Sequence, residues 1–385
     1  MTTVFSAVDK HFTLHDQNNQ ALIDSLKAKS PPAPLFYADI QWTKVCLSMA
    51  LDLVTYGTGL TLTYAFAAQV LKKISGKVNP PSLTSRVWNT TSMLLPFAAY
   101  RCVQIVVGLL VHPISFPFIG MFVGAQFDGR RGMILDQGFM PLRFSARSGF
   151  GHTIDGIFLK NPKITVSTDE NPLQGRCIVF SVGNSAAYES FLMDRNVYAL
   201  SKKLNANLLV YNYAGVVGSS GFFPNQDAMV ASHSAMLDFL EALGAKEIVD
   251  FGWSIGGGVQ WRSHSEKTRD KKRYCVVSYK TFLSTRHFGE RIAGWLGGFG
   301  VSFLRWNYDN ETAMKQSMVG KVVVQTVGPN NTILSDGVID QENALGKKAK
   351  KDEFVGTQSP HNKLLSRTEI EMITEKVNHH FSPRH

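Results

Sequence analysis

The sequence predicts an α/β protein in which a mostly parallel β-sheet is covered by helices on both faces, with an apolar helical hairpin before it. From about residue 151, short β-rich runs alternate with helical stretches, which is the pattern of parallel strands joined by crossover helices. Two long uncharged segments precede this region. Apolar residues make up 44% of the 385 residues and charged residues 18%, so the chain is not mostly disordered.

The charge and cysteine content exclude several classes of protein. The formal net charge is +10, but no nucleic-acid-binding motif accompanies it, so we expect no nucleic-acid partner. The four cysteines, at positions 46, 102, 177 and 275, form no C-x-x-C pair. We therefore expect neither a disulfide framework nor a metal site, and no motif indicates a cofactor. The first thirty residues contain no apolar core of the length that a cleavable signal peptide needs.

The two uncharged segments are long enough to reach across a bilayer. Residues 53–71 are nineteen residues without a charge, which as a helix would span about 28 Å. Residues 102–127 are twenty-six uncharged residues, and Pro113 and Pro117 are expected to kink or break that helix. The alternative is a pair of buried helices in a soluble domain.

These segments define the predicted domains. Residues 1–44 form a polar N-terminal segment, residues 45–130 a membrane-associated helical hairpin, and residues 140–385 the α/β domain. A hairpin makes the chain a multi-pass membrane protein with the bilayer as partner, and it puts the α/β domain on the same side as the N-terminus. Basic residues lie within the loop that connects the two segments and also on both outer flanks. The positive-inside rule therefore does not fix the side. The oligomeric state also stays open.

The elements of the α/β domain follow in order. Residues 156–160 and 163–168 are predicted to pair as antiparallel strands. Buried strands are predicted at 176–182, 206–213, 246–254, 273–282 and 321–327, and helices at 196–204 and 226–244. Residues 344–358 are charged and predict an exposed loop or helix end. The apolar run 292–304 predicts a core or cap helix, or the lining of an acyl-binding groove. The basic run 262–273 predicts a solvated helix end or a contact with anionic lipid.

A sequence motif stands where the strand 246–254 ends. Gly252-Trp253-Ser254-Ile255-Gly256 has the form G-x-S-x-G and leads into a predicted helix. Such a strand–turn–helix junction holds a serine in a strained conformation with its hydroxyl exposed above the sheet, and larger residues at the two glycine positions would clash. We therefore predict Ser254 to be a nucleophile. The N–H of Ile255 and that of Gly183 or Asn184, which follow the strand 176–182, are the predicted oxyanion hole.

Chain order predicts the partners of the serine, because in this arrangement the acid follows the serine and the histidine comes last. His361, in a loop before a helical stretch, is the candidate base. The acid should closely follow the strand 321–327, where Asn330 and Asn331 stand instead. Asp336 comes slightly later, in an Asp-Gly turn. Asp336, Asn331 and an incomplete triad all stay open.

At this point the chain resembles the α/β-hydrolase superfamily. The resemblance rests on RCIVFSVGNSAAYES, NLLVYNYAGVVGSSG, IVDFGWSIGGGVQ and VVSYKTFLS, taken in that order. More narrowly, the chain is similar to the chlamydial CHLPS 43-kilodalton protein family in length and in its apolar N-terminal part. The resemblance implies an α/β-hydrolase fold and membrane association, and it implies little about the substrate.

Two classes of function follow from these residues. The first is a membrane-anchored serine hydrolase that acts on an ester, a thioester or a lipid, in which Ser254 attacks and His361 is the general base. The second is a catalytically impaired hydrolase-fold protein that acts as a membrane-bound interaction module. The missing acid favours the second class, and the intact motif with a late histidine favours the first.

Overall fold

The computed structural model of the protein describes residues 100, 103–104, 106–108, 134, 136–148, 152–161, 163–164, 175–184, 186–221 and 224–382. The predicted N-terminal segment 1–44, the apolar segment 53–71 and most of the segment 102–127 lie outside these residues. Among the described residues, no helix combines the length and the apolar character needed to cross a membrane. The membrane hairpin therefore stays a prediction.

The described fold is built on an eight-stranded sheet in the order β1-β2-β4-β3-β5-β6-β7-β8. The strands are β1 (Met140–Arg147), β2 (Thr153–Lys160), β3 (Arg176–Ser181), β4 (Ala206–Tyr211), β5 (Glu247–Trp253), β6 (Tyr274–Tyr279), β7 (Gly320–Thr326) and β8 (Phe354–Thr357). β2 runs antiparallel to both of its neighbours, and every pairing from β4 to β8 is parallel. The sheet is therefore mostly parallel, as the sequence predicts.

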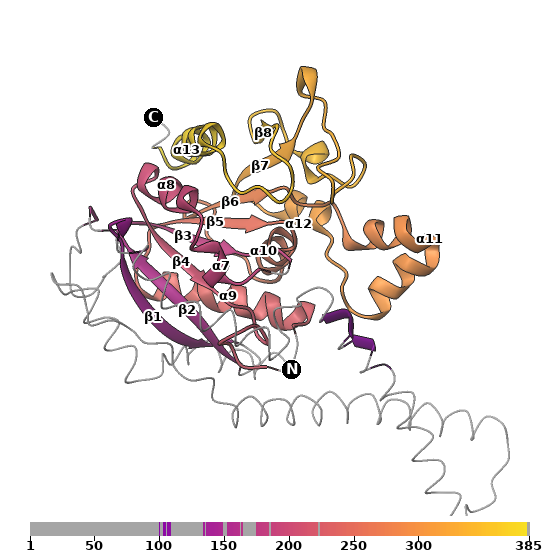
Figure 1. The fold of residues 1–385 in the computed structure, drawn as a ribbon, viewed down its shortest axis with the longest axis horizontal. Helices are drawn as coiled ribbons and strands as arrows, with labels where there is room; N and C mark the ends of the chain where they lie inside the picture. Colours follow the sequence, from indigo (N-terminus) through magenta and orange to yellow (C-terminus); the bar gives the residue numbers. More distant parts are fainter. Residues whose placement is uncertain are drawn as a thin grey trace, which may run out of the picture.

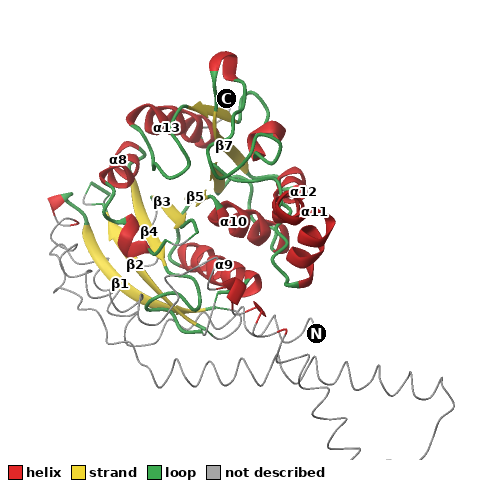
Figure 2. Cartoon of the chain, turned by 45° about the vertical axis from the view of Figure 1, so that its right-hand side comes forward, coloured by secondary structure: helices red, strands yellow, loops and turns green. Residues whose placement is uncertain are grey.

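Helices cover both faces of the sheet (Figures 1 and 2). They are α7 (Tyr188–Phe191), α8 (Arg195–Lys203), α9 (Gln226–Ala242), α10 (Ile255–Glu266), α11 (Thr285–Phe303), α12 (Asn310–Gln316) and α13 (Arg367–Phe381). α8 and α13 pack together on one face, and α9, α10 and α12 lie on the other. Because both faces are covered, the central strands are mostly apolar, and every residue of β4 and β6 is buried.

Local sequence explains where the main helices begin and end. Asp194, Asn225 and Ser366 are the N-caps of α8, α9 and α13, and each side chain accepts a hydrogen bond from a backbone N–H of the first turn. After α9, Gly244 adopts φ 83°, the left-handed conformation that commonly ends a helix. The predicted helices 196–204 and 226–244 are confirmed by α8 and α9.

Two predicted elements differ from the structure. The antiparallel neighbours of β2 are β1 and β4, and not residues 163–168 as predicted; of that predicted strand, only residues 163–164 are among the described residues. Residues 344–358 are more than an exposed loop, because they contain the short helix Leu345–Lys348 and the edge strand β8. Leu345 and Val355 point into the core and are buried, so this charged segment is anchored by a few apolar side chains.

Candidate active site

Ser254 lies at the junction between β5 and α10. It adopts φ 55° and ψ −117°, a conformation that is unfavourable for a residue with a side chain and that concentrates at functional sites. The two motif glycines are sterically required. A Cβ at Gly252 would lie 2.7 Å from the Cα of Gly257, and one at Gly256 would lie 2.2 Å from the carbonyl oxygen of Ser181. The junction therefore packs directly on the end of β3.

The structure brings Ser254, His361 and Asp336 together from three separate segments. The Oγ of Ser254 lies 3.1 Å from Nε2 of His361, and Nδ1 of His361 lies 2.8 Å from Oδ2 of Asp336. A carboxylate only accepts hydrogen bonds, so the Nδ1–H of the histidine donates to Asp336 and Nε2 is left to accept the serine hydroxyl. Ser254, His361 and Asp336 are 8%, 4% and 7% exposed.

The turn around Asp336 keeps its carboxylate charged. Oδ1 accepts hydrogen bonds from the N–H of Ile339 at 2.7 Å and of Val338 at 3.0 Å. Burial alone would raise the pKa of Asp336, but the bonds from His361 and from these two amides outweigh it and hold the pKa below its ordinary value. The backbone N–H of His361 also donates to the carbonyl oxygen of Asp336 at 3.2 Å, so the two residues are tied at side chain and main chain.

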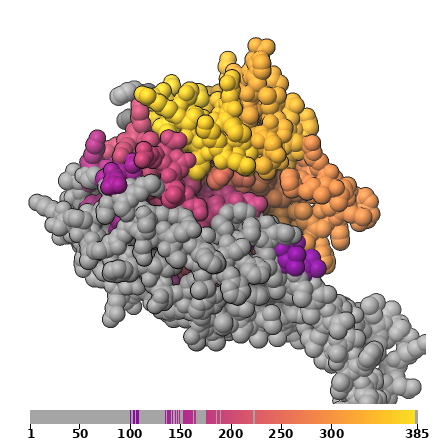
Figure 3. Space-filling model, viewed as in Figure 1, coloured from indigo at the N-terminus to yellow at the C-terminus, as the bar shows by residue number. Residues whose placement is uncertain are grey.

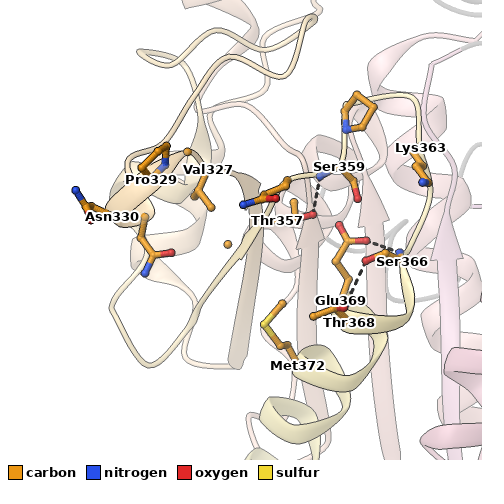
Figure 4. Close-up of a pocket in the computed structure, with 15 residues that line it drawn as sticks. Val327, Pro329, Asn330, Thr357, Ser359, Lys363, Ser366, Thr368, Glu369 and Met372 are labelled. Atoms are coloured by element: carbon orange, nitrogen blue, oxygen red, sulfur yellow. Dashed lines mark hydrogen bonds between the residues drawn. The ribbon is translucent and has the colours of Figure 1, made fainter.

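Asn330 and Asn331, where sequence reasoning expected an acid, line a cavity next to the site. Both are exposed and adopt positive φ values of 58° and 57°. The cavity has a volume of about 680 Å³ and is bounded by the end of β7, by β8 and by the start of α13. Figure 4 shows Glu369 and Ser366 on its α13 wall, joined by the hydrogen bonds of a capping box. The residue beside His361 is Asp336, and Asn331 belongs to this separate cavity.

The predicted oxyanion-hole residues lie around the first turn of α10. Ile255 begins that helix, and Gly183 and Asn184 follow β3. A Cβ at Gly256 would also lie 2.8 Å from the carbonyl oxygen of Val182, and one at Gly183 would lie 3.2 Å from the ring of Trp253. The segment after β3 is therefore in contact with both sides of the serine turn. The binding of an oxyanion by these amides stays a prediction.

Lys280, directly after β6, belongs to the site although sequence reasoning missed it. Its side chain is fully buried, and Nζ donates hydrogen bonds to the carbonyl oxygens of Pro360 at 2.7 Å and Lys363 at 2.9 Å. Burial lowers the pKa of this lysine to about 8, against the opposing attraction of Glu369 and Asp336. The available signal was a single lysine at the end of an otherwise uncharged strand.

A second polar network lies inside the protein and does not reach the surface. Oδ2 of Asp250 lies 3.0 Å from Nε2 of His233 and 2.9 Å from Nε2 of His264, while Nδ1 of His233 lies 2.9 Å from Oγ of Ser181. Burial alone would raise the pKa of Asp250, but the two histidines outweigh it and hold that pKa far below its ordinary value. Ser181, His233 and Asp250 are all 0% exposed, so this network joins β3 and β5 to α9 and α10 and meets no substrate.

The described residues hold no group of three or more His, Cys, Asp or Glu side chains that could bind a metal ion. At Ser254 the structure shows a hydroxyl in contact with an imidazole that is in turn in contact with a carboxylate.

The strand order, the serine turn after β5 and the chain order of Ser254, Asp336 and His361 define the α/β-hydrolase fold. Residues 151–382 match the family described as Chlamydia CHLPS protein (DUF818). This match spans more than half of the chain, and the protein belongs to that family.

Solved structures with similar folds include several hydrolases. An esterase of Pyrococcus furiosus, Pf2001, is 16% identical, with 64% of this chain and 91% of that chain covered at a TM-score of 0.44. Acetyl xylan esterase 1 from a Thermoanaerobacterium species is 13% identical, covering 67% and 94% at a TM-score of 0.44. An alpha-beta hydrolase from Vibrio vulnificus is 13% identical, covering 68% and 91% at a TM-score of 0.43. No curated protein matches the sequence.

Proposed function

We propose that the protein is a membrane-associated serine hydrolase that acts on an ester, a thioester or a lipid, with Ser254 as nucleophile, His361 as general base and Asp336 as the orienting acid. The observation that carries the proposal is the connected pair of contacts, Ser254 Oγ to His361 Nε2 at 3.1 Å and His361 Nδ1 to Asp336 Oδ2 at 2.8 Å. Serine hydrolases use this arrangement to make a weakly nucleophilic hydroxyl reactive.

The proposed reaction has two halves. As Oγ of Ser254 bonds to the carbonyl carbon of the substrate, its proton passes to Nε2 of His361, and the histidine then returns that proton to the departing alcohol or thiol. In the second half, His361 takes a proton from water as the water oxygen attacks the acyl carbon. The bond from the acyl carbon to Oγ of Ser254 then breaks, Oγ takes the proton back from His361, and the carboxylic acid is released. The carboxylate of Asp336 stabilises the imidazolium that forms in both halves.

The negative charge that develops on the substrate oxygen also needs a partner. In this proposal the backbone N–H of Ile255 and that of Gly183 or Asn184 donate to this oxygen. Two features support the assignment: Ile255 is at the N-terminus of α10, where backbone amides are unpaired and the helix dipole favours negative charge, and the segment after β3 contacts the same turn.

A fluorophosphonate probe tests the catalytic proposal directly. The purified full-length chain should form a covalent adduct, and Ser254→Ala should not. Ser265→Ala is the matched control, because Ser265 is an exposed serine on the same helix. Absence of labelling, together with no hydrolysis of short-chain esters, would favour the interaction-module alternative. In the sequence, the lack of an acid directly after residues 321–327 favoured that alternative. The contact between Asp336 and His361 supports the catalytic proposal instead.

The membrane part of the proposal rests on the uncharged segments 53–71 and 102–127. Two helices of this kind would anchor the chain as a hairpin with the hydrolase-fold domain on the side of the N-terminus. Alkaline carbonate extraction of membranes containing the full-length chain should leave it in the pellet. Its release into the soluble fraction would show that these segments do not span a bilayer.

A further inference from the structure

α11 (Thr285–Phe303) is a helical hairpin rather than one straight helix. The helical conformation is interrupted at Ala293 and at Gly294, which adopts φ 58° and ψ −152°. Two glycines let the arms touch: a Cβ at Gly297 would lie 2.0 Å from the carbonyl oxygen of Gly289, and one at Gly289 would lie 2.6 Å from that of Gly297. Figure 1 shows this hairpin projecting away from the body of the domain.

The hairpin carries its large apolar side chains on the outside. Ile292 is 72% exposed, and Trp295, Leu296, Phe299 and Phe303 are 75%, 58%, 60% and 56% exposed. Single exposed apolar residues are common on protein surfaces, but a group of them on one projecting element marks an interaction site. Because these side chains contribute little to the core, the fold alone does not account for them.

This surface continues into the start of the second uncharged segment of the chain. The hydroxyl of Tyr100 donates a hydrogen bond to the carbonyl oxygen of Phe303 at 3.0 Å, and the two rings meet edge to face with centroids 5.0 Å apart. Val103 and Val106, which follow Tyr100, are also exposed. Figures 1 and 3 show this short segment directly beside α11. The run of twenty-six uncharged residues begins at Cys102, so Val103 and Val106 are described residues from the start of that run.

The charges on α11 are arranged for a lipid surface. Residues 292–304 contain no charged side chain. Exposed arginines stand near the two ends of α11 (Arg286 and Arg305) and directly before Ile292 (Arg291), and they pair with Glu290, Asp227 and Asp340 respectively. Tryptophan favours the membrane interface, and arginine near such a surface is attracted to anionic head groups. A projecting apolar tip needs a matching groove to bind another protein, but a bilayer accepts it without one.

We propose that the apolar face of α11, together with the exposed side chains of Val103 and Val106, is a docking surface for a lipid bilayer that contains anionic lipids. The hairpin lies in the interfacial region and does not cross the membrane, because neither arm is long enough to span it. The α11 part of this contact lies outside the membrane hairpin predicted for residues 45–130 and adjoins it through Val103 and Val106. The contact does not depend on whether Ser254 is reactive.

Docking in this way would turn the candidate active site towards the bilayer. α11 follows β6, whose C-terminal end lies at the same edge of the parallel sheet as Ser254. The guanidinium of Arg291 also pairs with Oδ2 of Asp340 at 2.9 Å, and Asp340 belongs to the loop that carries Asp336. The hairpin therefore connects the proposed lipid contact to the loop of the proposed acid.

A fluorescent probe on the hairpin tests this proposal in the full-length chain. Leu296→Cys carries an environment-sensitive fluorophore in a background with Cys46→Ala and Cys102→Ala; the remaining cysteines, Cys177 and Cys275, are buried. Lys272→Cys, at an exposed position outside the hairpin, is the matched control. Each labelled protein is mixed with phosphatidylcholine vesicles containing phosphatidylglycerol, and bound protein is separated by flotation. The expected result is a blue shift and quenching by nitroxide-labelled lipid at position 296 and neither effect at position 272.

Three results would overturn the proposal. In the first, the protein floats with the vesicles while the probe at position 296 is neither shifted nor quenched, so that membrane binding occurs elsewhere on the chain. In the second, a blue shift appears without vesicles and grows with protein concentration, which means that a second copy covers the hairpin. In the third, the blue shift is present without vesicles at every concentration, which means that another segment of the same chain covers it.

Discussion

Lys280 holds the main chain on both sides of His361, because its buried Nζ donates hydrogen bonds to the carbonyl oxygens of Pro360 and Lys363. The histidine ring must stay aligned with Ser254 and with Asp336, which come from two other segments. A side chain that bonds the backbone before and after the histidine limits how far that ring can move. The hydrogen bonds of the Lys280 side chain go to the backbone around His361, so we regard Lys280 as a positioning residue.

Lys280→Met should therefore impair the site without removing any of its reacting groups. Displacements of about 1 Å can cost on the order of 10²-fold in rate, and we expect the rate of fluorophosphonate labelling to fall by a similar factor. Lys363→Met is the control, because only the backbone carbonyl of Lys363 takes part in this contact. Equal labelling rates in both variants would mean that the lysine does not position His361.

The same residue should make stability depend on pH. Burial lowers the pKa of Lys280 from 10.5 to about 8. Between these values the unfolded chain binds the proton and the folded chain does not, so the free energy of unfolding should rise as pH increases through this window. The rise attributable to this group is roughly 3 kcal/mol. Urea unfolding of the wild type and of Lys280→Met at several pH values should show a steeper rise in the wild type, and the difference between the two curves is the contribution of Lys280; parallel curves would argue against the lowered pKa.

Substitutions of Ser254, His361 and Asp336 should separate their roles. Ser254→Ala and His361→Ala should each lower ester hydrolysis on the order of 10⁶-fold, because the two act as a unit. Asp336→Asn should cost less, on the order of 10⁴-fold, since it keeps the shape but loses the charge. Asn331→Ala is the control and should be nearly silent, because Asn331 lines the neighbouring cavity. A damaging Asn331→Ala with a silent Asp336→Asn would reverse the assignment of the acid.

The sequence was informative where local pattern determines structure. An apolar strand followed by Gly252-x-Ser254-x-Gly256 requires a sharp turn, since the glycines leave room for the backbone contacts around that turn. His361 was chosen from chain order and from its place in a loop before a helical stretch. The acid stayed ambiguous because its identity depends on the path of a loop. The carboxylate of Asp336 that meets the histidine is also held in a turn by the amides of Val338 and Ile339, and a sequence pattern does not show this turn.

Other features depend on long-range contacts that no pattern indicates. The partner of β2 was mispredicted because residues 163–168 read as an equally good strand, and only the assembled sheet puts β1 and β4 beside β2. β8 is four residues long within a charged segment, which is too short to show an alternating pattern. The exposure of the run 292–304 was unforeseen, because an apolar helix in the middle of a domain is normally buried.

The contact between the serine turn and β3 can be tested at Gly256. In an exposed helix, alanine in place of glycine stabilises by about 1 kcal/mol, but at Gly256 the new Cβ would meet the carbonyl oxygens of Ser181 at 2.2 Å and Val182 at 2.8 Å. Gly256→Ala should therefore lower the free energy of unfolding by about 1–3 kcal/mol. The control is Gly300→Ala in α11, where a Cβ has no neighbour within 4 Å, and this variant should be at least as stable as the wild type. Urea unfolding measures the free energy of unfolding of both variants, and a Gly256→Ala variant as stable as the wild type would contradict the close contact with β3.

The strain at Ser254 predicts an unusual order of stability. Its φ of 55° and ψ of −117° are unfavourable for any residue with a Cβ but accessible to glycine. Ser254→Gly should therefore be more stable than Ser254→Ala by about 1–3 kcal/mol, the usual cost of such a conformation. Ser265, exposed on the same helix, should give the opposite order, with glycine less stable than alanine by about 1 kcal/mol. Thermal and urea unfolding of the four variants measure both differences, and neither Ser254 variant should react with a fluorophosphonate. If glycine is the less stable residue at both positions, Ser254 stores no strain, and its backbone conformation has no bearing on the proposed reactivity.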